Sequence, residues 1–125
     1  MSEHRAAGLK KLAEIDGDDG VALVRGLESF APDMAHYVTD FAFGDIYARP
    51  GLDLRSREIA AVAALSALGH APAQLRLHVN GALNVGCTPE EVIEIILQTI
   101  VFAGFPAALN AIAVAREVFE SRPSD

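Results

Sequence analysis

The chain has 125 residues, 51% of them hydrophobic, and a formal net charge of −7. This length fits one domain, so we expect residues 1–125 to form a single domain. Nucleic-acid binding needs a basic surface that neutralises phosphates, and an acidic chain is repelled by anionic membranes, so we predict neither partner. Cys87 is the single cysteine and cannot form a disulfide within the chain, which fits a reducing compartment.

The first residues, MSEHRAAGLKKL, are charged and lack the apolar core of a signal peptide. Apolar runs elsewhere are too short, or too interrupted by charge, to span a bilayer. We therefore expect a cytoplasmic protein. A domain of this size buries only about two-thirds of its unfolded surface. Part of the apolar surface is thus expected to be covered by subunit contacts.

Apolar residues recur with helical spacing, and no alternating pattern typical of a strand is found, so we predict an all-α fold of about six helices. For the first half of the chain we predict a helix over 3–15, a loop over 16–20 (DGDDG), a short helix to about 27 and a helix over 32–48.

For the second half we predict helices over about 54–69, 72–86, 89–103 and 106–120. The helices over 54–69 and 72–86 form a central antiparallel hairpin that turns near His70. The clearest local signal is Thr88-Pro89-Glu90-Glu91, because Thr88 caps the helix and Glu91 completes a capping box. The last two helices are apolar on several faces, which favours burial by neighbouring subunits; a tightly packed monomer is the alternative.

Four motifs follow one another at characteristic spacing. They are R-x-R-E before an Ala-rich helix, a helical His followed by G-A-L-N-x-G, the T-P-E-E-V helix start, and the A-G-F-P-A-A-L-N-A junction. Together they make residues 41–119 resemble the carboxymuconolactone decarboxylase family. The resemblance implies an alkyl hydroperoxidase D-like helical fold that assembles as a ring, as a homohexamer or homotrimer.

Peroxidase-type members of this family carry C-x-x-C-x-x-x-H. When their His is aligned with His78, the two cysteine positions fall on Ala71 and Gln74, so the thiol chemistry lacks its nucleophile. Decarboxylase-type members commonly carry F-A-x-G-E-x-W-S-R-P-G-L. This chain has Asp45 for the Glu and Tyr47 for the Trp, and it has Glu58 where decarboxylase members often have a small or apolar residue. These differences leave the decarboxylase branch favoured and the substrate open.

Decarboxylation of an unsaturated lactone needs groups that hold carboxylates, stabilise charge on the carbonyl oxygen, and return a proton to carbon. His78, on a helix with apolar neighbours, is the candidate proton donor, because imidazole titrates near neutral pH. The alternative is a core histidine with one hydrogen bond. Glu58 is the candidate second catalytic residue. Helical rise offsets it from His78 by roughly 7 Å, so direct contact requires a steep helix crossing or a bridging water. Alternatively, Glu58 pairs with Arg55.

Arginines are the expected carboxylate ligands, and Arg76 and Arg49 are the preferred candidates over Arg55 and Arg57. Tyr47 is expected to donate to a substrate oxygen or to line the pocket. The histidines show no metal-ligand spacing and no Gly-rich phosphate loop follows a strand, so we predict no metal and no cofactor.

The sequence therefore predicts a cofactor-independent lyase that decarboxylates a small anionic acid, such as 4-carboxymuconolactone or a related acid in aromatic-compound catabolism. A non-catalytic oligomeric ligand-binding or scaffold protein is the alternative. A thiol-dependent alkyl hydroperoxidase-like activity is the third hypothesis.

Overall fold

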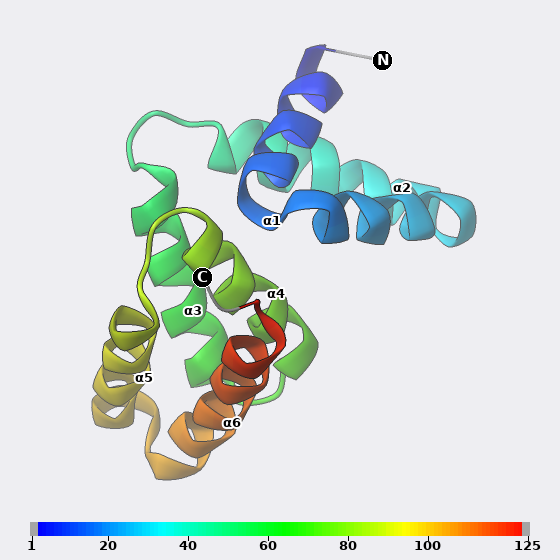
Figure 1. Cartoon of the computed structure of the whole chain (residues 1–125). Helices are drawn as coiled ribbons and strands as arrows, with labels where there is room; N and C mark the ends of the chain where they lie inside the picture. The colour runs from blue at the N-terminus through cyan, green and yellow to red at the C-terminus, as the bar shows by residue number, and fades with distance from the viewer. Residues whose placement is uncertain (1–2, 124–125) are drawn as a thin grey trace. The chain divides into compact units, whose positions relative to one another are not determined.

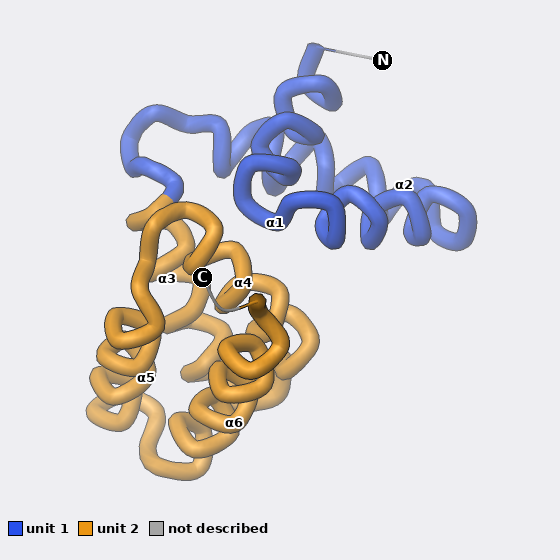
Figure 2. The backbone as a smooth tube through the Cα atoms, viewed as in Figure 1, with its two compact units in different colours: residues 1–54 blue, residues 55–125 orange. Residues whose placement is uncertain are grey.

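The computed structural model describes residues 3–123, and within them it is built from helices (Figure 1), which confirms the predicted all-α fold. The elements are α1 (Glu3–Phe30), α2 (Pro32–His36), the π-helical η1 (Tyr37–Tyr47), α3 (Leu54–Leu68), α4 (Pro72–Asn84), α5 (Pro89–Ala103) and α6 (Phe105–Ser121). They form two compact units, which meet in the sequence at Leu54 and Arg55 (Figure 2). The single-domain assignment stays a prediction, and each unit is described by itself.

In the first unit, α1 packs against η1 and α2. Two glycines allow this close approach. A Cβ atom on Gly8 would lie 1.9 Å from the carbonyl oxygen of Thr39, and one on Gly44 would lie 2.8 Å from that of His4. Real Cβ contacts are not this short, so the two backbones can meet only where side chains are absent.

The DGDDG segment was expected to be a loop, and that expectation is wrong. Helix α1 continues through it, and Gly17 alone has non-helical backbone angles (φ 61°, ψ −149°). Glycine adopts this left-handed region at little cost, so it kinks the helix without ending it. Ile15 and Val24 are buried on either side of the kink, and this packing holds both halves in helical form.

The predicted helix over 32–48 is present as two consecutive segments, α2 and η1. Eleven residues of η1 are wound as a π-helix, which the apolar spacing does not distinguish from an α-helix. Pro32 stands at the start of α2, as expected for a residue that lacks a backbone N–H.

The second unit contains one apolar core. Helix α6 packs against both α4 and α5, and α3 contributes Val62 to the same core. The residues in it are Val62, Leu75, Val79, Ala82, Cys87, Val92, Ile96, Ala108, Ala111, Val114, Ala115 and Val118. Small side chains predominate on α6, which lets its backbone approach its neighbours closely.

The predicted capping box at the start of α5 is confirmed. The Glu91 backbone N–H donates to Thr88 Oγ1 at 3.1 Å, and the Thr88 N–H donates to Glu91 Oε1 at 2.9 Å. Gly104 ends the helix with φ 86°, also as expected. Helices α3 and α4 follow each other across a short turn at Gly69 (φ 75°). No helix in residues 3–123 is both long enough and apolar enough to cross a membrane.

Candidate active site

Glu58 occupies a core position of α3. It shares one face of the helix with Val62 and Ser66, at spacings of four residues, and all three side chains are buried. A carboxyl group in such a position requires a partner, because burying an unpaired charge is costly. The helix therefore places an acid where its apolar pattern calls for an aliphatic residue.

His78 lies on α4 beside the core stripe formed by Leu75 and Val79. Its Nδ1 atom is 2.8 Å from Oε1 of Glu58. The Glu58 side chain is fully buried, and the His78 side chain is 16% exposed. The two groups thus make the direct contact that the sequence left open, and no bridging water is needed between them.

The second carboxylate oxygen of Glu58, Oε2, is buried and has no hydrogen-bond partner in the described chain. The contact with Nδ1 is therefore the polar anchor of this side chain that the structure shows. When Glu58 is ionised it can only accept, so Nδ1 carries the hydrogen. Proton exchange with another molecule then falls to the second ring nitrogen, Nε2, of His78.

Arg55 lies three residues before Glu58, on the same side of α3, and forms an ion pair with Glu91 of the capping box. Cys87 lies near Arg55, Glu91 and Glu58, and all three affect the pKa of its thiol. Burial raises this pKa, the positive charge of Arg55 lowers it, and the negative charges of Glu91 and Glu58 raise it further. Arg55 thus lies near Cys87, as Glu58 does, and shares a side of α3 with Glu58. The signal in the sequence was its spacing of three from Glu58.

Arg76 does not share a face of α4 with His78. Residues two apart on a helix do not share a face, so Arg76 and His78 diverge. The Arg76 guanidinium donates to Glu117 Oε2 of α6 through Nη2 (2.9 Å) and Nε (3.1 Å), in an exposed pair. Its predicted role in substrate binding stays a prediction.

Tyr47 and Arg49 belong to the first unit. The Tyr47 ring stacks on Phe43, with centroids 5.0 Å apart, at the end of η1. The Arg49 backbone N–H donates to the Ile46 carbonyl at 3.1 Å, in the turn that follows. Their proposed contact with substrate likewise stays a prediction.

At the positions of the peroxidase cysteines, Ala71 stands at the N-cap position of α4, without a side-chain cap, and Gln74 is exposed on the first turn. Cys87, beyond the other end of α4, is buried. Across residues 3–123, no three His, Cys, Asp or Glu side chains are grouped as metal ligands would be. The candidate site therefore consists of the partly buried imidazole of His78, oriented by the buried carboxylate of Glu58, and this pair is suited to proton transfer.

The sequence profile of the carboxymuconolactone decarboxylase family matches residues 32–117. A 4-carboxymuconolactone decarboxylase from Acinetobacter baylyi is 35% identical over 114 residues, which cover 90% of this chain and 84% of that protein. An uncharacterised 15.0 kDa protein from Paracoccus denitrificans is 33% identical over 97 residues (77% and 72%). A nitrosuccinic acid decarboxylase from Metarhizium robertsii is 30% identical over 112 residues (88% and 77%).

Proposed function

The chain belongs to the carboxymuconolactone decarboxylase family, and we propose that it is a cofactor-independent carboxy-lyase acting on a small carboxylated lactone, such as 4-carboxymuconolactone, or on a related acid. The observation that carries this proposal is the hydrogen bond between Glu58 and His78. Two relatives named as decarboxylases support the reaction class.

The substrates in the names of those relatives share one chemical feature. Each carries a carboxylate placed so that an electron-withdrawing group, a lactone carbonyl or a nitro group, can accept the electrons left by CO2. An acceptor within the substrate removes the need for an added electron sink. The proposed substrate class is therefore a small anionic acid with a built-in acceptor.

In the proposed reaction, the bond between the ring carbon and its carboxylate breaks and CO2 departs. The electron pair moves through the conjugated system to the lactone carbonyl, giving a dienolate. A proton from Nε2 of His78 is then delivered to a ring carbon, which restores the neutral lactone carbonyl. Glu58, bonded to Nδ1, orients the ring and stabilises the positive charge of its protonated form.

Substrate carboxylates need cationic partners, and arginine offers two parallel N–H donors to them. We assign Arg55 this role beside the Glu58–His78 pair, because it lies on the same side of α3. Arg76, Arg49 and Tyr47 keep their proposed roles in substrate binding. Arg55 and Arg76 are each paired with a carboxylate of the chain, Glu91 and Glu117, so binding a substrate requires either a second N–H of the guanidinium or an opening of the pair.

The proposed activity is tested by CO2 release from 4-carboxymuconolactone and related acids. The expected result is turnover by the purified protein that chelators and thiol-blocking reagents do not reduce, and that His78→Ala abolishes. Failure of the pure protein on every such acid would leave the non-catalytic scaffold as the better hypothesis. Turnover of a hydroperoxide that is lost in Cys87→Ser would instead favour the peroxidase hypothesis.

We also propose that copies of the chain assemble with one another. Large apolar side chains are exposed where α5 ends and α6 begins: Val101, Phe102, Phe105 and Leu109. Phe105 and Leu109 are four residues apart and share a face of α6. An apolar cluster of this kind is typical of a surface that a partner covers, and a second copy is the partner proposed here.

A further inference from the structure

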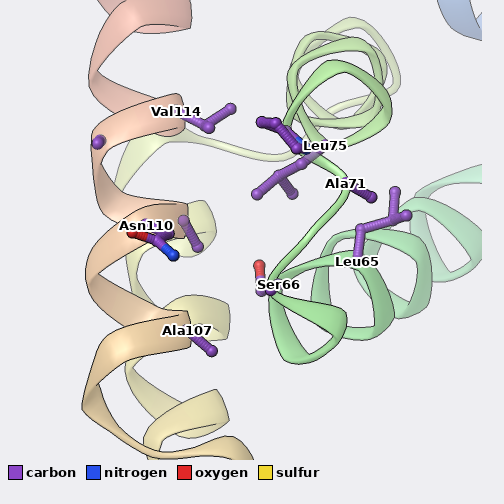
Figure 3. Close-up of a pocket in the computed structure, with 11 residues that line it drawn as sticks. Leu65, Ser66, Ala71, Leu75, Ala107, Asn110 and Val114 are labelled. Carbon is purple, nitrogen blue, oxygen red and sulfur yellow. The ribbon is translucent and has the colours of Figure 1, made fainter.

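The second unit contains a pocket away from the Glu58–His78 pair. It has a volume of about 270 Å³ and lies between the end of α3, the start of α4 and one face of α6 (Figure 3). The residues that line it are Leu65, Ser66, Gly69, Ala71, Pro72, Leu75, Ala107, Asn110, Ala111, Ala113 and Val114. Neither Glu58 nor His78 is among them.

Two polar side chains interrupt a lining that is otherwise aliphatic. Ser66 is buried, with an exposure of 1%, and Asn110 lies at the solvent-exposed edge. Figure 3 shows the two side chains on opposite walls, Ser66 on α3 and Asn110 on α6, both directed toward the space between the helices. Asn110 belongs to the A-G-F-P-A-A-L-N-A motif, which the proposed reaction does not use.

The Ser66 hydroxyl is the unusual group. Buried hydroxyls in helices commonly donate to a carbonyl of the preceding turn. Thr99, which is buried, does so, with Oγ1 at 3.0 Å from the Ile95 carbonyl oxygen. Ser66 Oγ has no such partner within the described residues and is fully buried. Its hydrogen-bonding capacity is therefore available to whatever occupies the pocket.

Size and charge limit that occupant. An apolar protein cavity of about 150 Å³ is large enough to bind benzene, so a pocket of about 270 Å³ accommodates one substituted ring. No lining residue carries a formal charge, and an ion would lose its hydration there without gaining a countercharge. We propose that this pocket binds a small uncharged ring compound carrying one hydroxyl or carbonyl group, which bonds to Ser66 and Asn110.

This site is separate from the proposed catalytic one. Ser66 follows Glu58 by eight residues on α3, about 12 Å along the helix axis. The ligand class also differs, since the proposed substrate is anionic and this ligand is neutral. Binding here is therefore expected to survive the loss of His78, and the two proposals fail independently.

The test is a titration followed by amide NMR shifts, with phenol, toluene and benzoate as probes at pH 7. Phenol is expected to shift the amides of the pocket and to bind about tenfold more tightly than toluene, which lacks the hydroxyl, or benzoate, which is charged. The same result is expected for His78→Ala. Equal binding of benzoate, or shifts located outside the pocket, would overturn the proposal.

Two variants identify the site. Ser66→Ala removes an unpartnered hydroxyl, so the fold is expected to persist while phenol loses its advantage over toluene. Ala107→Leu fills the pocket from α6 and is expected to abolish binding of both probes. Ala64→Leu, the same change at an exposed position of α3 outside the lining, is the control and should bind normally.

Unchanged phenol binding in Ser66→Ala and Ala107→Leu would contradict the assignment. If phenol shifts nothing in the wild-type protein, and Ala107→Leu lowers the mass measured in solution, then a second copy fills the pocket and the ligand proposal is wrong.

Discussion

Nδ1 of His78 and Oε1 of Glu58 are 2.8 Å apart, although the two residues are separated by 20 positions and belong to consecutive helices. The acid is fully buried and the imidazole is 16% exposed. When Glu58 is ionised, this arrangement fixes Nδ1 as a ring nitrogen that carries a hydrogen. The imidazole is the member of the pair that reaches the surface.

Replacing Glu58 with Gln is expected to lower kcat about 100-fold while changing KM little, because the ring loses both its fixed tautomer and its countercharge. The alkaline limb of the pH–rate profile should also move to lower pH, since the protonated ring is less stabilised. Steady-state CO2 release across pH measures both effects. Glu94→Gln, on the exposed face of α5, is the matched control; an unshifted profile in Glu58→Gln would refute the positioning role.

The contact between Glu58 and His78 shows where sequence reasoning reached its limit. Helical rise alone put the two residues roughly 7 Å out of register, whereas the structure brings Nδ1 and Oε1 within 2.8 Å. The placement of α3 and α4 depends on a core that includes Val62 and Val79 from both helices, and no local pattern encodes it. The capping box of Thr88 and Glu91 was predicted correctly, because its two residues are only three positions apart.

The same limit explains the segment around Gly17. Composition predicted a loop, but burial of Ile15 and Val24 on both sides keeps the chain helical and confines the break to one glycine. Long-range ion pairs are likewise beyond local rules. The sequence did not show that Arg76 pairs with Glu117 of α6, because that contact joins residues 41 positions apart.

Arg55 and Arg76 can be separated by kinetics. Arg55→Ala is expected to raise KM about tenfold or more, because a carboxylate loses a charged hydrogen-bond partner. Arg76→Ala should change KM less, since Arg76 lies two residues before His78 and on another face of α4. Arg116→Ala, which breaks an exposed pair with Glu120, is the control. The reverse order of effects would reassign the substrate carboxylate to Arg76.

The capping box supports a prediction about stability. Thr88→Ala is expected to lower the free energy of unfolding by about 1 kcal/mol, as loss of a helix N-cap typically does. Urea unfolding followed by circular dichroism measures this. Thr88→Ser keeps the hydroxyl and should retain most of the stability; equal losses in both variants would show that the hydroxyl contributes nothing.

Because of Glu91, the contribution of the capping box to the free energy of unfolding is expected to depend on pH. The hydrogen bond from the Thr88 backbone holds the pKa of Glu91 below its ordinary value of 4.5. An acid whose pKa is lower in the folded state stabilises the fold at a pH above its unfolded-state pKa. This stabilisation is lost as the pH falls through the folded-state pKa. Glu91→Gln should therefore differ from the wild type at pH 7 and converge with it at acidic pH. A difference that stays constant with pH would contradict the assignment.

Cys87 should behave as a protected thiol. Burial raises its pKa above the ordinary value of 9.0, so at pH 8 the native protein should react with iodoacetamide more slowly than the urea-unfolded protein. Because the raised pKa favours the protonated thiol in the folded state, its stabilising effect is complete below about pH 9 and is lost at higher pH. Labelling followed by mass spectrometry gives the rates, and equal rates in both states would show that the thiolate is not disfavoured.

The apolar cluster at the α5–α6 junction supports a prediction about assembly. Phe102 is 81% exposed, and Val101, Phe105 and Leu109 beside it are also exposed. A cluster covered by a second copy would be weakened by a polar residue, so Phe102→Ser should lower the mass measured by light scattering. Phe102→Leu keeps an apolar side chain and should assemble like the wild type. A wild-type protein that is monomeric at every tested concentration would exclude self-association, and the cluster would then need a different partner.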